Sequence, residues 1–208
     1  MAGVLSNFRN TIILSCLIAL VFLVGYGIHF EKEQHGVLDL HGNYVQAVLR
    51  WAHTFAGILW IGLLYYFNFV QIRKMPDIPA ELKPAVSKYI APEALFWFRW
   101  AALATWVIGV ILAWSRGYLF DAYTLGATSG FHDPRVVFIG VGMWLATIMF
   151  INVWVFIWPN QKIALGMVEG DADAKAKAGR TAMLFSRTNL LLSIPMLTAM
   201  TMNQTIFY

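Results

Sequence analysis

One face of a predicted helix carries four residues that together suggest a cofactor site: Arg50, His53, Gly57 and Trp60. They recur at i, i+3, i+7 and i+10, so they lie along one side of an α-helix. The His53 ring nitrogen can bind haem iron, and Gly57 lets a flat macrocycle approach the backbone. The guanidinium of Arg50 can pair with propionates. The spacing therefore predicts a haem b site with His53 as the metal ligand.

The same spacing is also typical of helix packing, and this alternative stays open. A histidine in an apolar helix can bond to a neighbouring helix, while Gly57 and Gly62 allow two helices to approach closely. A b-type haem usually needs a second axial ligand. Met143 and Met196 are expected at a depth similar to that of His53, but methionine is also the common gap-filler of apolar cores.

Other polar residues suggest further sites or contacts. The remaining histidines are near acidic residues on one predicted side of the membrane: His29, His35, His41 and His132. They lack the tight spacing of a metal site, so we expect a solvated rim in place of a zinc or copper centre. Arg99 is expected to extend to the lipid headgroups. Asn152, Asn189 and Asn203 are expected to bond between helices, and Pro195 to kink its helix.

The composition is that of a multi-pass membrane protein. Of 208 residues, 59% are hydrophobic and 12% are charged, and the mean hydropathy is +0.62. Soluble domains carry about 25% charged residues. The single cysteine, Cys16, excludes an internal disulfide, a cysteine zinc site and a Cys-x-x-Cys-His haem attachment within this sequence. No catalytic triad or phosphate-binding loop is recognisable.

Uncharged stretches predict an all-α membrane bundle of about five helices that forms one domain over 1–208. We place these helices at roughly 10–29, 45–71, 94–114, 136–158 and 183–204, because a bilayer core needs about 20 apolar residues. The first apolar run is longer than that of a signal peptide, so we expect it to be retained. The proline-rich 75–92 segment is expected to be irregular.

Positive charges predict the orientation. Arg9 and the loops 73–93 and 160–187 hold ten Lys and Arg residues, whereas the alternate loops hold three. We therefore expect a cytoplasmic N-terminus and an external C-terminus in the inner (cell) membrane. The net charge of +4 then reflects topology, and we expect the lipid bilayer and other membrane subunits as partners, with no nucleic acid.

Four blocks in the same order resemble the membrane domain of cytochrome-linked urate oxidases. They are Leu49–Gly62 (LRWAHTFAGILWIG), Phe96–Trp106 with Gly109, the run Leu145–Met149, Asn152–Val153 and Pro159–Gln161, and Ser186 with Asn189–Pro195. The resemblance covers roughly residues 45–205. It implies a haem-binding, electron-transferring domain of a urate-oxidising family, with His53 as the candidate ligand.

The chain departs from this family at several positions. About Gly140, Thr188 and Gln204 stand where the family has histidines, and Ala101 replaces its acidic residue. No cytochrome c motif is present. We therefore expect a shortened, divergent relative that serves as an accessory or structural subunit of a larger membrane redox complex and is not an enzyme on its own. The alternatives are a haem b electron carrier that uses His53 and an oxidase of urate or a related substrate.

Overall fold

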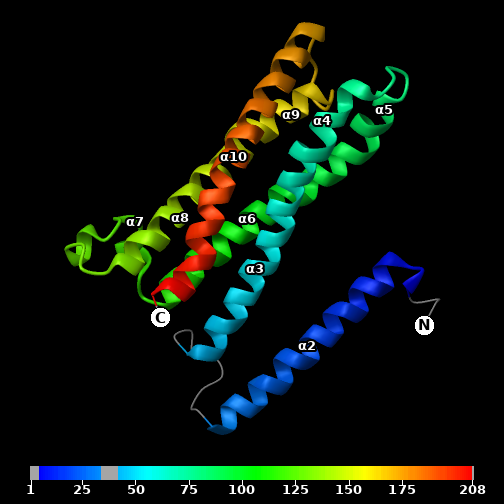
Figure 1. Ribbon diagram of the computed structural model, residues 1–208. Coiled ribbons are helices and arrows are strands. Elements are labelled where there is room, and N and C mark those ends of the chain that lie inside the picture. Colours follow the sequence, from blue (N-terminus) through cyan, green and yellow to red (C-terminus); the bar gives the residue numbers. More distant parts are fainter. Residues whose placement is uncertain (1–4, 34–41, 208) are drawn as a thin grey trace. The chain divides into compact units, whose positions relative to one another are not determined.

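The computed structural model describes residues 5–33 and 42–207, and every regular element in these ranges is helical (Figure 1). The chain divides into two compact units, Met1–Trp51 and Ala52–Tyr208, which we describe one at a time. The helical membrane fold that the sequence predicts is confirmed. The single domain over 1–208 stays a prediction.

The first unit contains a long apolar helix, α2 (Phe8–Glu33), and the first two turns of α3 (Asn43–Tyr65). Asn7 Oδ1 accepts a hydrogen bond from the main-chain N–H of Asn10 and satisfies one of the free donors at the start of α2. The hydroxyl of Tyr44 donates to the carbonyl of Leu23, which ties the start of α3 to α2. The unit is thus a helical hairpin.

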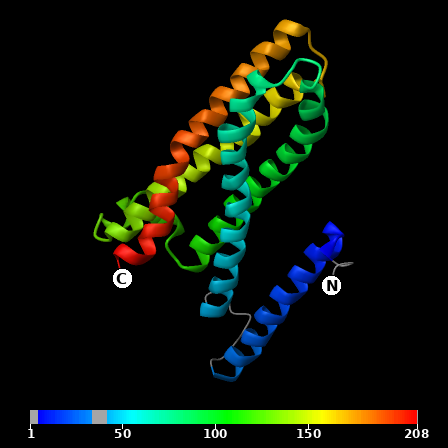
Figure 2. The same ribbon diagram turned by 45° about the vertical axis from the view of Figure 1, so that its right-hand side comes forward.

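The second unit is a bundle of long helical rods (Figures 1 and 2). The first rod continues α3 through η1 (Tyr66–Gln71), α4 (Ile72–Lys74) and η2 (Met75–Asp77). The second joins α5 (Lys83–Ala85), η3 (Val86–Ile90) and α6 (Ala91–Ser115), and short elements α7 (Leu119–Tyr123) and η4 (Ala127–Ser129) follow. The third comprises α8 (Pro134–Ile151), η5 (Asn152–Ile157) and α9 (Trp158–Ala164), and the last is α10 (Ala172–Ile206). Helix α10 packs along the whole third rod.

Two apolar clusters hold the second unit together. The larger one joins residues from all four rods, and its fully buried side chains include Trp60, Leu64 and Met149. The smaller one contains Ala113, Ala122 and Met143 at the α7 end. A Cβ atom at Gly142 would lie 2.9 Å from that of Ala199, so glycine permits the close contact of α8 with α10.

Within the described residues, four helical stretches are long and apolar enough to cross a membrane: Phe8–Gly25, Asn43–Asp77, Lys83–Ser115 and Pro134–Ala164. The fifth predicted range, 183–204, is helical as expected, but it lies within α10 and is less apolar. This difference has a physical reason. Arg187 interrupts the apolar run, and polar Asn189 and Ser193 are fully buried inside the bundle, where they replace apolar core residues.

The proline-rich segment 75–92 corrects one prediction. It was expected to be irregular, but it is helical from Lys83 onward and continues into α6. Pro84 occupies the first turn of this helical stretch, where a missing N–H costs little, whereas Pro92 lies inside it. The π-helical turns η3 and η5 each end two residues before a proline, Pro92 and Pro159. A widened turn accommodates a ring that cannot donate to the preceding turn.

Candidate functional site

The His53 side chain binds the neighbouring helix. Its Nδ1 lies 2.9 Å from the main-chain carbonyl oxygen of Thr105 on α6. A carbonyl oxygen can only accept, so Nδ1 carries the proton and the lone pair is on Nε2. The Thr105 hydroxyl donates in turn to the carbonyl of Ala101, at 2.7 Å. His53 thus acts in the structure as a link between α3 and α6.

Gly109 makes the space for this link. A Cβ atom at this position would lie 2.8 Å from Cε1 and 3.0 Å from Nδ1 of His53, which is closer than Cβ atoms approach other groups. Thr105 and Gly109 are one helical turn apart, so they meet the imidazole on one face of α6. The sequence reasoning noted Gly109 within the family-like block but gave it no role.

The other predicted haem-site residues are dispersed or packed. Trp60 is fully buried in the larger cluster, and a Cβ atom at Gly57 would lie 3.7 Å from the Thr105 methyl group. Arg50 precedes them on α3, within the first unit. The two candidate second ligands are buried in different clusters, Met143 in the smaller one and Met196 in the larger one.

This face of α3 makes a helix–helix contact with α6 at His53 and Gly57. The space that Gly57 was expected to offer to haem is taken by Thr105 of α6. One feature of His53 is also found in metal sites. Imidazoles that bind a metal are commonly oriented by a hydrogen bond from the other ring nitrogen to a carbonyl, as Nδ1 makes here. The ligand role of His53 therefore stays a prediction.

A buried amide pair joins the third rod to α10, as the sequence predicts. Asn152 Nδ2 donates to Asn189 Oδ1 at 2.8 Å, and Asn189 Nδ2 donates to the carbonyl of Met149 at 3.0 Å. Asn152 begins the π-helical turn η5. Near the end of the chain, Asn203 Nδ2 donates to the carbonyl of Arg135, so the third asparagine also bonds between helices.

A second polar contact, which the sequence reasoning missed, joins the first rod to α10. Asn68 Nδ2 donates to the hydroxyl oxygen of Ser186, at 2.9 Å, and to the carbonyl of Leu64 on its own helix. One turn earlier, the hydroxyls of Tyr65 and Ser193 are 3.2 Å apart. Asn68 lies in the π-helical turn η1. The hydrogen bond to α10 therefore forms where the first rod departs from α-helical geometry.

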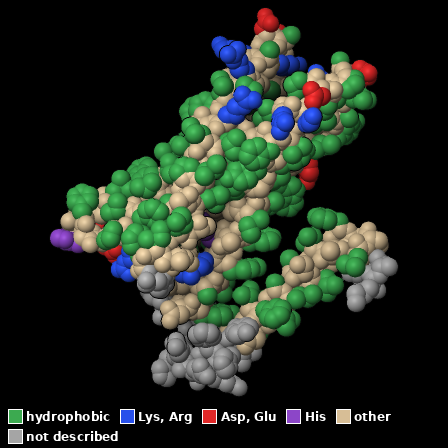
Figure 3. All heavy atoms as spheres, in the orientation of Figure 1, with side chains coloured by type: hydrophobic (Ala, Val, Ile, Leu, Met, Phe, Trp, Pro, Cys, Tyr) green, Lys and Arg blue, Asp and Glu red, His purple; other side chains and the backbone are tan. Residues whose placement is uncertain are grey.

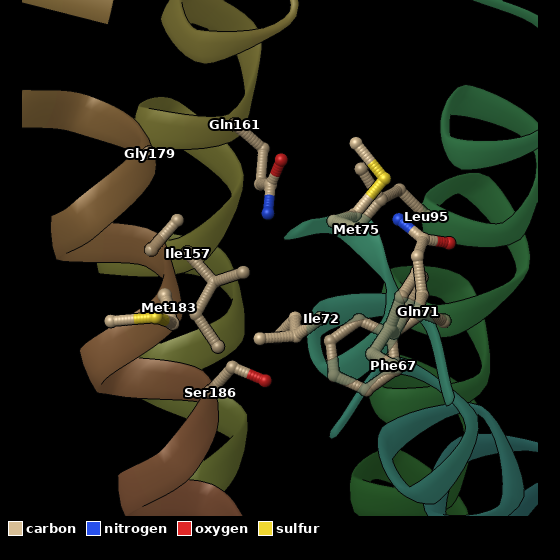
Figure 4. A pocket seen from close by; sticks show the side chains of 12 residues that line it. Phe67, Gln71, Ile72, Met75, Leu95, Ile157, Gln161, Gly179, Met183 and Ser186 are labelled. Carbon is tan, nitrogen blue, oxygen red and sulfur yellow. The ribbon is translucent and has the colours of Figure 1, made fainter. Parts of the chain in front are cut away.

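A cavity of about 190 Å³ lies between the first rod, the end of the third rod and α10 (Figure 4). Apolar side chains dominate its lining, and its polar groups are Gln71, Gln161 and Ser186. Gln161 extends its amide into the space beside α4 (Figure 4). The Gln71 Oε1 atom is buried without a protein donor, as happens where an ordered water binds. The cavity has the chemistry of a small hydrated pocket.

The predicted outer rim is described only in part. His35 and His41, and the side chain of His29, lie outside the described residues. His132 is exposed, and no group of metal-binding residues forms within the described ranges. In the nearby loop, the Thr128 hydroxyl and the Ser129 N–H donate to Asp121 Oδ1 at 2.7 and 3.1 Å. These hydrogen bonds, the one from Thr128 above all, hold the pKa of Asp121 below its ordinary value.

A family model for the urate oxidase N-terminal domain matches residues 117–207. This segment is therefore similar to the urate oxidase N-terminal domain. The matched segment contains α7, α8, η5, α9 and α10, and therefore the Asn152–Asn189 pair. His53 precedes it in the sequence. The chain matches no curated protein and no solved structure.

Proposed function

We propose that this multi-pass membrane protein is an accessory, structural subunit of a larger membrane complex. The observation that carries the proposal is that polar side chains inside the second unit form hydrogen bonds between helices. Each of three pairs joins two rods: His53 with Thr105, Asn152 with Asn189, and Asn68 with Ser186. Side chains that could perform chemistry are engaged in holding helices together, as in a scaffold.

The redox character of the proposed complex rests on the segment that is similar to the urate oxidase N-terminal domain. The related family carries histidines and an acidic residue at several positions. In this chain, those positions are occupied by residues that cannot perform redox or acid–base chemistry. Gly140 and Ala101 are buried in helix contacts, and the hydroxyl of Thr188 donates to the carbonyl of Leu184 on its own helix. We infer that the fold is retained and that partner subunits supply the cofactors and the catalytic groups.

The alternative is a haem b electron carrier that uses His53. One observation favours it: the bond to Thr105 leaves the Nε2 lone pair available to a metal. Haem at this position would supply one-electron transfer, and Thr105 would fix the imidazole tautomer and orientation. The packing of Gly57 against Thr105 weighs against this alternative.

One preparation tests both possibilities. The protein is gently solubilised from native membranes, its reduced-minus-oxidised absorption spectrum is recorded, and the co-purifying chains are identified. A structural subunit gives stoichiometric partner chains that become unstable when it is deleted, and any haem band persists in the His53→Ala variant. The exposed His132→Ala variant is the matched control.

Two outcomes would overturn the proposal. A b-type haem band that is lost in His53→Ala, but kept in His132→Ala, identifies an electron carrier. Consumption of urate by the purified chain alone, with an electron acceptor supplied, identifies an enzyme. A chain that purifies without stoichiometric partners from native membranes also contradicts a subunit role.

A further inference from the structure

Two cationic side chains, Arg99 of α6 and Lys162 of α9, lie over the indole ring of Trp158 at the start of α9. The guanidinium carbon of Arg99 is 3.9 Å from the ring centroid of Trp158 and 5.1 Å from that of Phe96. The Lys162 ammonium is 5.8 Å from the centroid of the same Trp158 ring. Aromatic faces attract cations, so the Trp158 ring interacts with both charges.

Neither cation is neutralised by a described carboxylate. The ion pairs found in residues 5–33 and 42–207 join Lys74 to Asp77 and Arg135 to Asp133. Glu93 is the acidic residue nearest to Arg99 in sequence, and it accepts a hydrogen bond from the indole of Trp97, at 2.8 Å. Two neighbouring cations without an acidic partner make a site that favours an anion.

The surroundings of Arg99 are typical of a membrane interface. It lies within the candidate span Lys83–Ser115, and its neighbours Phe96, Trp97 and Trp100 are 42–48% exposed. Exposed tryptophans gather at the level of the lipid headgroups. Basic side chains, with acidic ones among them, lie at this end of the second unit, where α4, α5 and α9 are found (Figure 3). The positive-inside rule predicts that this end faces the cytoplasm.

We propose that Arg99 and Lys162 bind the phosphate group of an anionic phospholipid. A guanidinium is planar, is weakly hydrated and can donate two parallel hydrogen bonds to phosphate oxygens, while Lys162 adds a second charge. Cytoplasmic leaflets are rich in anionic lipids, and basic pockets between membrane helices bind their headgroups. The exposed rings of Phe96 and Trp100 provide an apolar surface for the acyl chains. Free phosphate shares the oxyanion chemistry and is the competing source.

Lipid binding to the full-length protein tests this site. The delipidated protein is titrated with phosphatidylglycerol or phosphatidylcholine in mixed micelles, and bound lipid is counted by native mass spectrometry. We expect Arg99→Gln to weaken phosphatidylglycerol binding about fivefold, and the double change with Lys162→Gln by about 25-fold, since each interfacial cation contributes on the order of 1 kcal/mol. Phosphatidylcholine binding should not change. Arg73→Gln, an exposed site on α4, removes the same charge and is the matched control, with less than a twofold effect expected.

Three further measurements distinguish a lipid phosphate site from a site for free phosphate and from a simple charge effect. Arg99→Lys keeps the charge but loses the planar fork, so an intermediate affinity is expected. Trp158→Leu removes the ring that holds both cations and should weaken binding in the same direction. Millimolar inorganic phosphate that displaces phosphatidylglycerol would assign the site to free phosphate and overturn the lipid assignment.

The proposal is also wrong if Arg99→Gln binds phosphatidylglycerol as tightly as Arg73→Gln does. Equal weakening of both lipids would show an apolar contact without headgroup recognition, which contradicts a phosphate site. Helical circular dichroism and thermal unfolding of each variant establish that it is folded. Arg99→Lys preserves the charge and the long stem, so it serves as the readout if Arg99→Gln does not fold.

Discussion

Asn189, fully buried in α10, donates a hydrogen bond to the carbonyl oxygen of Met149 on α8, at the point where that helix widens into η5. The main-chain N–H of Asn152 is shared there between the carbonyls of Ile148 and Met149. A helix that changes from α to π geometry leaves its carbonyls poorly paired. The side chain of Asn189 supplies a donor at this position, so α10 stabilises the irregular turn of its neighbour.

Replacing Asn189 by alanine should destabilise the protein. The change leaves the Met149 carbonyl and the Asn152 amide without this partner, and interhelical hydrogen bonds in membrane proteins contribute about 0.5–2 kcal/mol. Thermal unfolding in detergent measures the loss. Thr188→Ala is the control, since that exposed hydroxyl bonds only within α10 in the described contacts. Equal unfolding temperatures for the two variants would contradict the role of Asn189.

His53 and Gly109 should be coupled in a double-mutant cycle. Gly109→Ala places a methyl group against the imidazole and is expected to cost about 1–3 kcal/mol of stability. His53→Ala removes the ring that would be struck, so the double variant should be less destabilised than the sum of the single changes. The expected coupling is at least about 0.5 kcal/mol. Strict additivity of the two unfolding free energies would rule out the contact.

Two glycines should respond to alanine in opposite directions. A Cβ atom at Gly140 would overlap the carbonyl oxygen of Ala122, so Gly140→Ala must displace α7 and destabilise the protein by about 1–3 kcal/mol. Nothing lies within 4 Å of the corresponding atom at Gly62, where alanine should raise stability by up to about 1 kcal/mol through helix propensity. Circular dichroism melting curves of both variants test this pair. A stable Gly140→Ala protein would mean that α7 is not packed on α8.

Acid should loosen the loop that follows α7. The pKa of Asp121 is lowered in the folded protein by the Thr128 hydroxyl and by Ser129. The ionised Asp121 carboxylate therefore stabilises the folded loop fully above its ordinary pKa of about 3.9. This stabilisation is lost as the pH falls through the lowered pKa that Asp121 has in the folded protein. Leu125 and Phe131 adopt positive φ angles in this loop, a strained conformation that depends on such bonds.

Amide hydrogen exchange or limited proteolysis across residues 124–131 at pH 7 and near pH 3 measures the loosening. Thr128→Ala removes the strongest of the bonds, so it should raise the Asp121 pKa and move the transition to higher pH. Asp121→Asn should reduce the pH dependence in this range to the part contributed by Asp133, whose pKa is also lowered, chiefly by the hydrogen bond from the Arg135 side chain. A loop that is equally protected at both pH values would contradict this interpretation.

Much of the helical framework follows from the sequence, because gaps between charged residues set the lengths of apolar helices. The predicted bonds from Asn152 and Asn189 also follow, since a buried amide must find a partner. The helical start of the second rod at Lys83 was missed because prolines were interpreted as breakers, although Pro84 occupies a first-turn position and the π-helical turn η3 precedes Pro92.

The candidate site was harder to predict because helix periodicity identifies a face but not what covers it. Gly57 was interpreted as space for a macrocycle, whereas the structure has the methyl group of Thr105 beside it. Nothing in the spacing of α3 alone could indicate that Gly109, more than 50 residues later, would receive the imidazole. The bond between Asn68 and Ser186 was missed for the same reason.

The π-helical turn η5 changes which side of the third rod faces lipid. A π turn contains one residue more than an α turn, so side chains beyond it are rotated by about 100° relative to an uninterrupted helix. A helical wheel drawn straight through Pro134–Ala164 would therefore assign the wrong face to Gln161, which lines the cavity. Deleting one residue within Asn152–Ile157 would convert the π turn to an α turn and leave Gln161 on the side of the cavity. Alignments of related chains should accordingly show single-residue gaps at this turn.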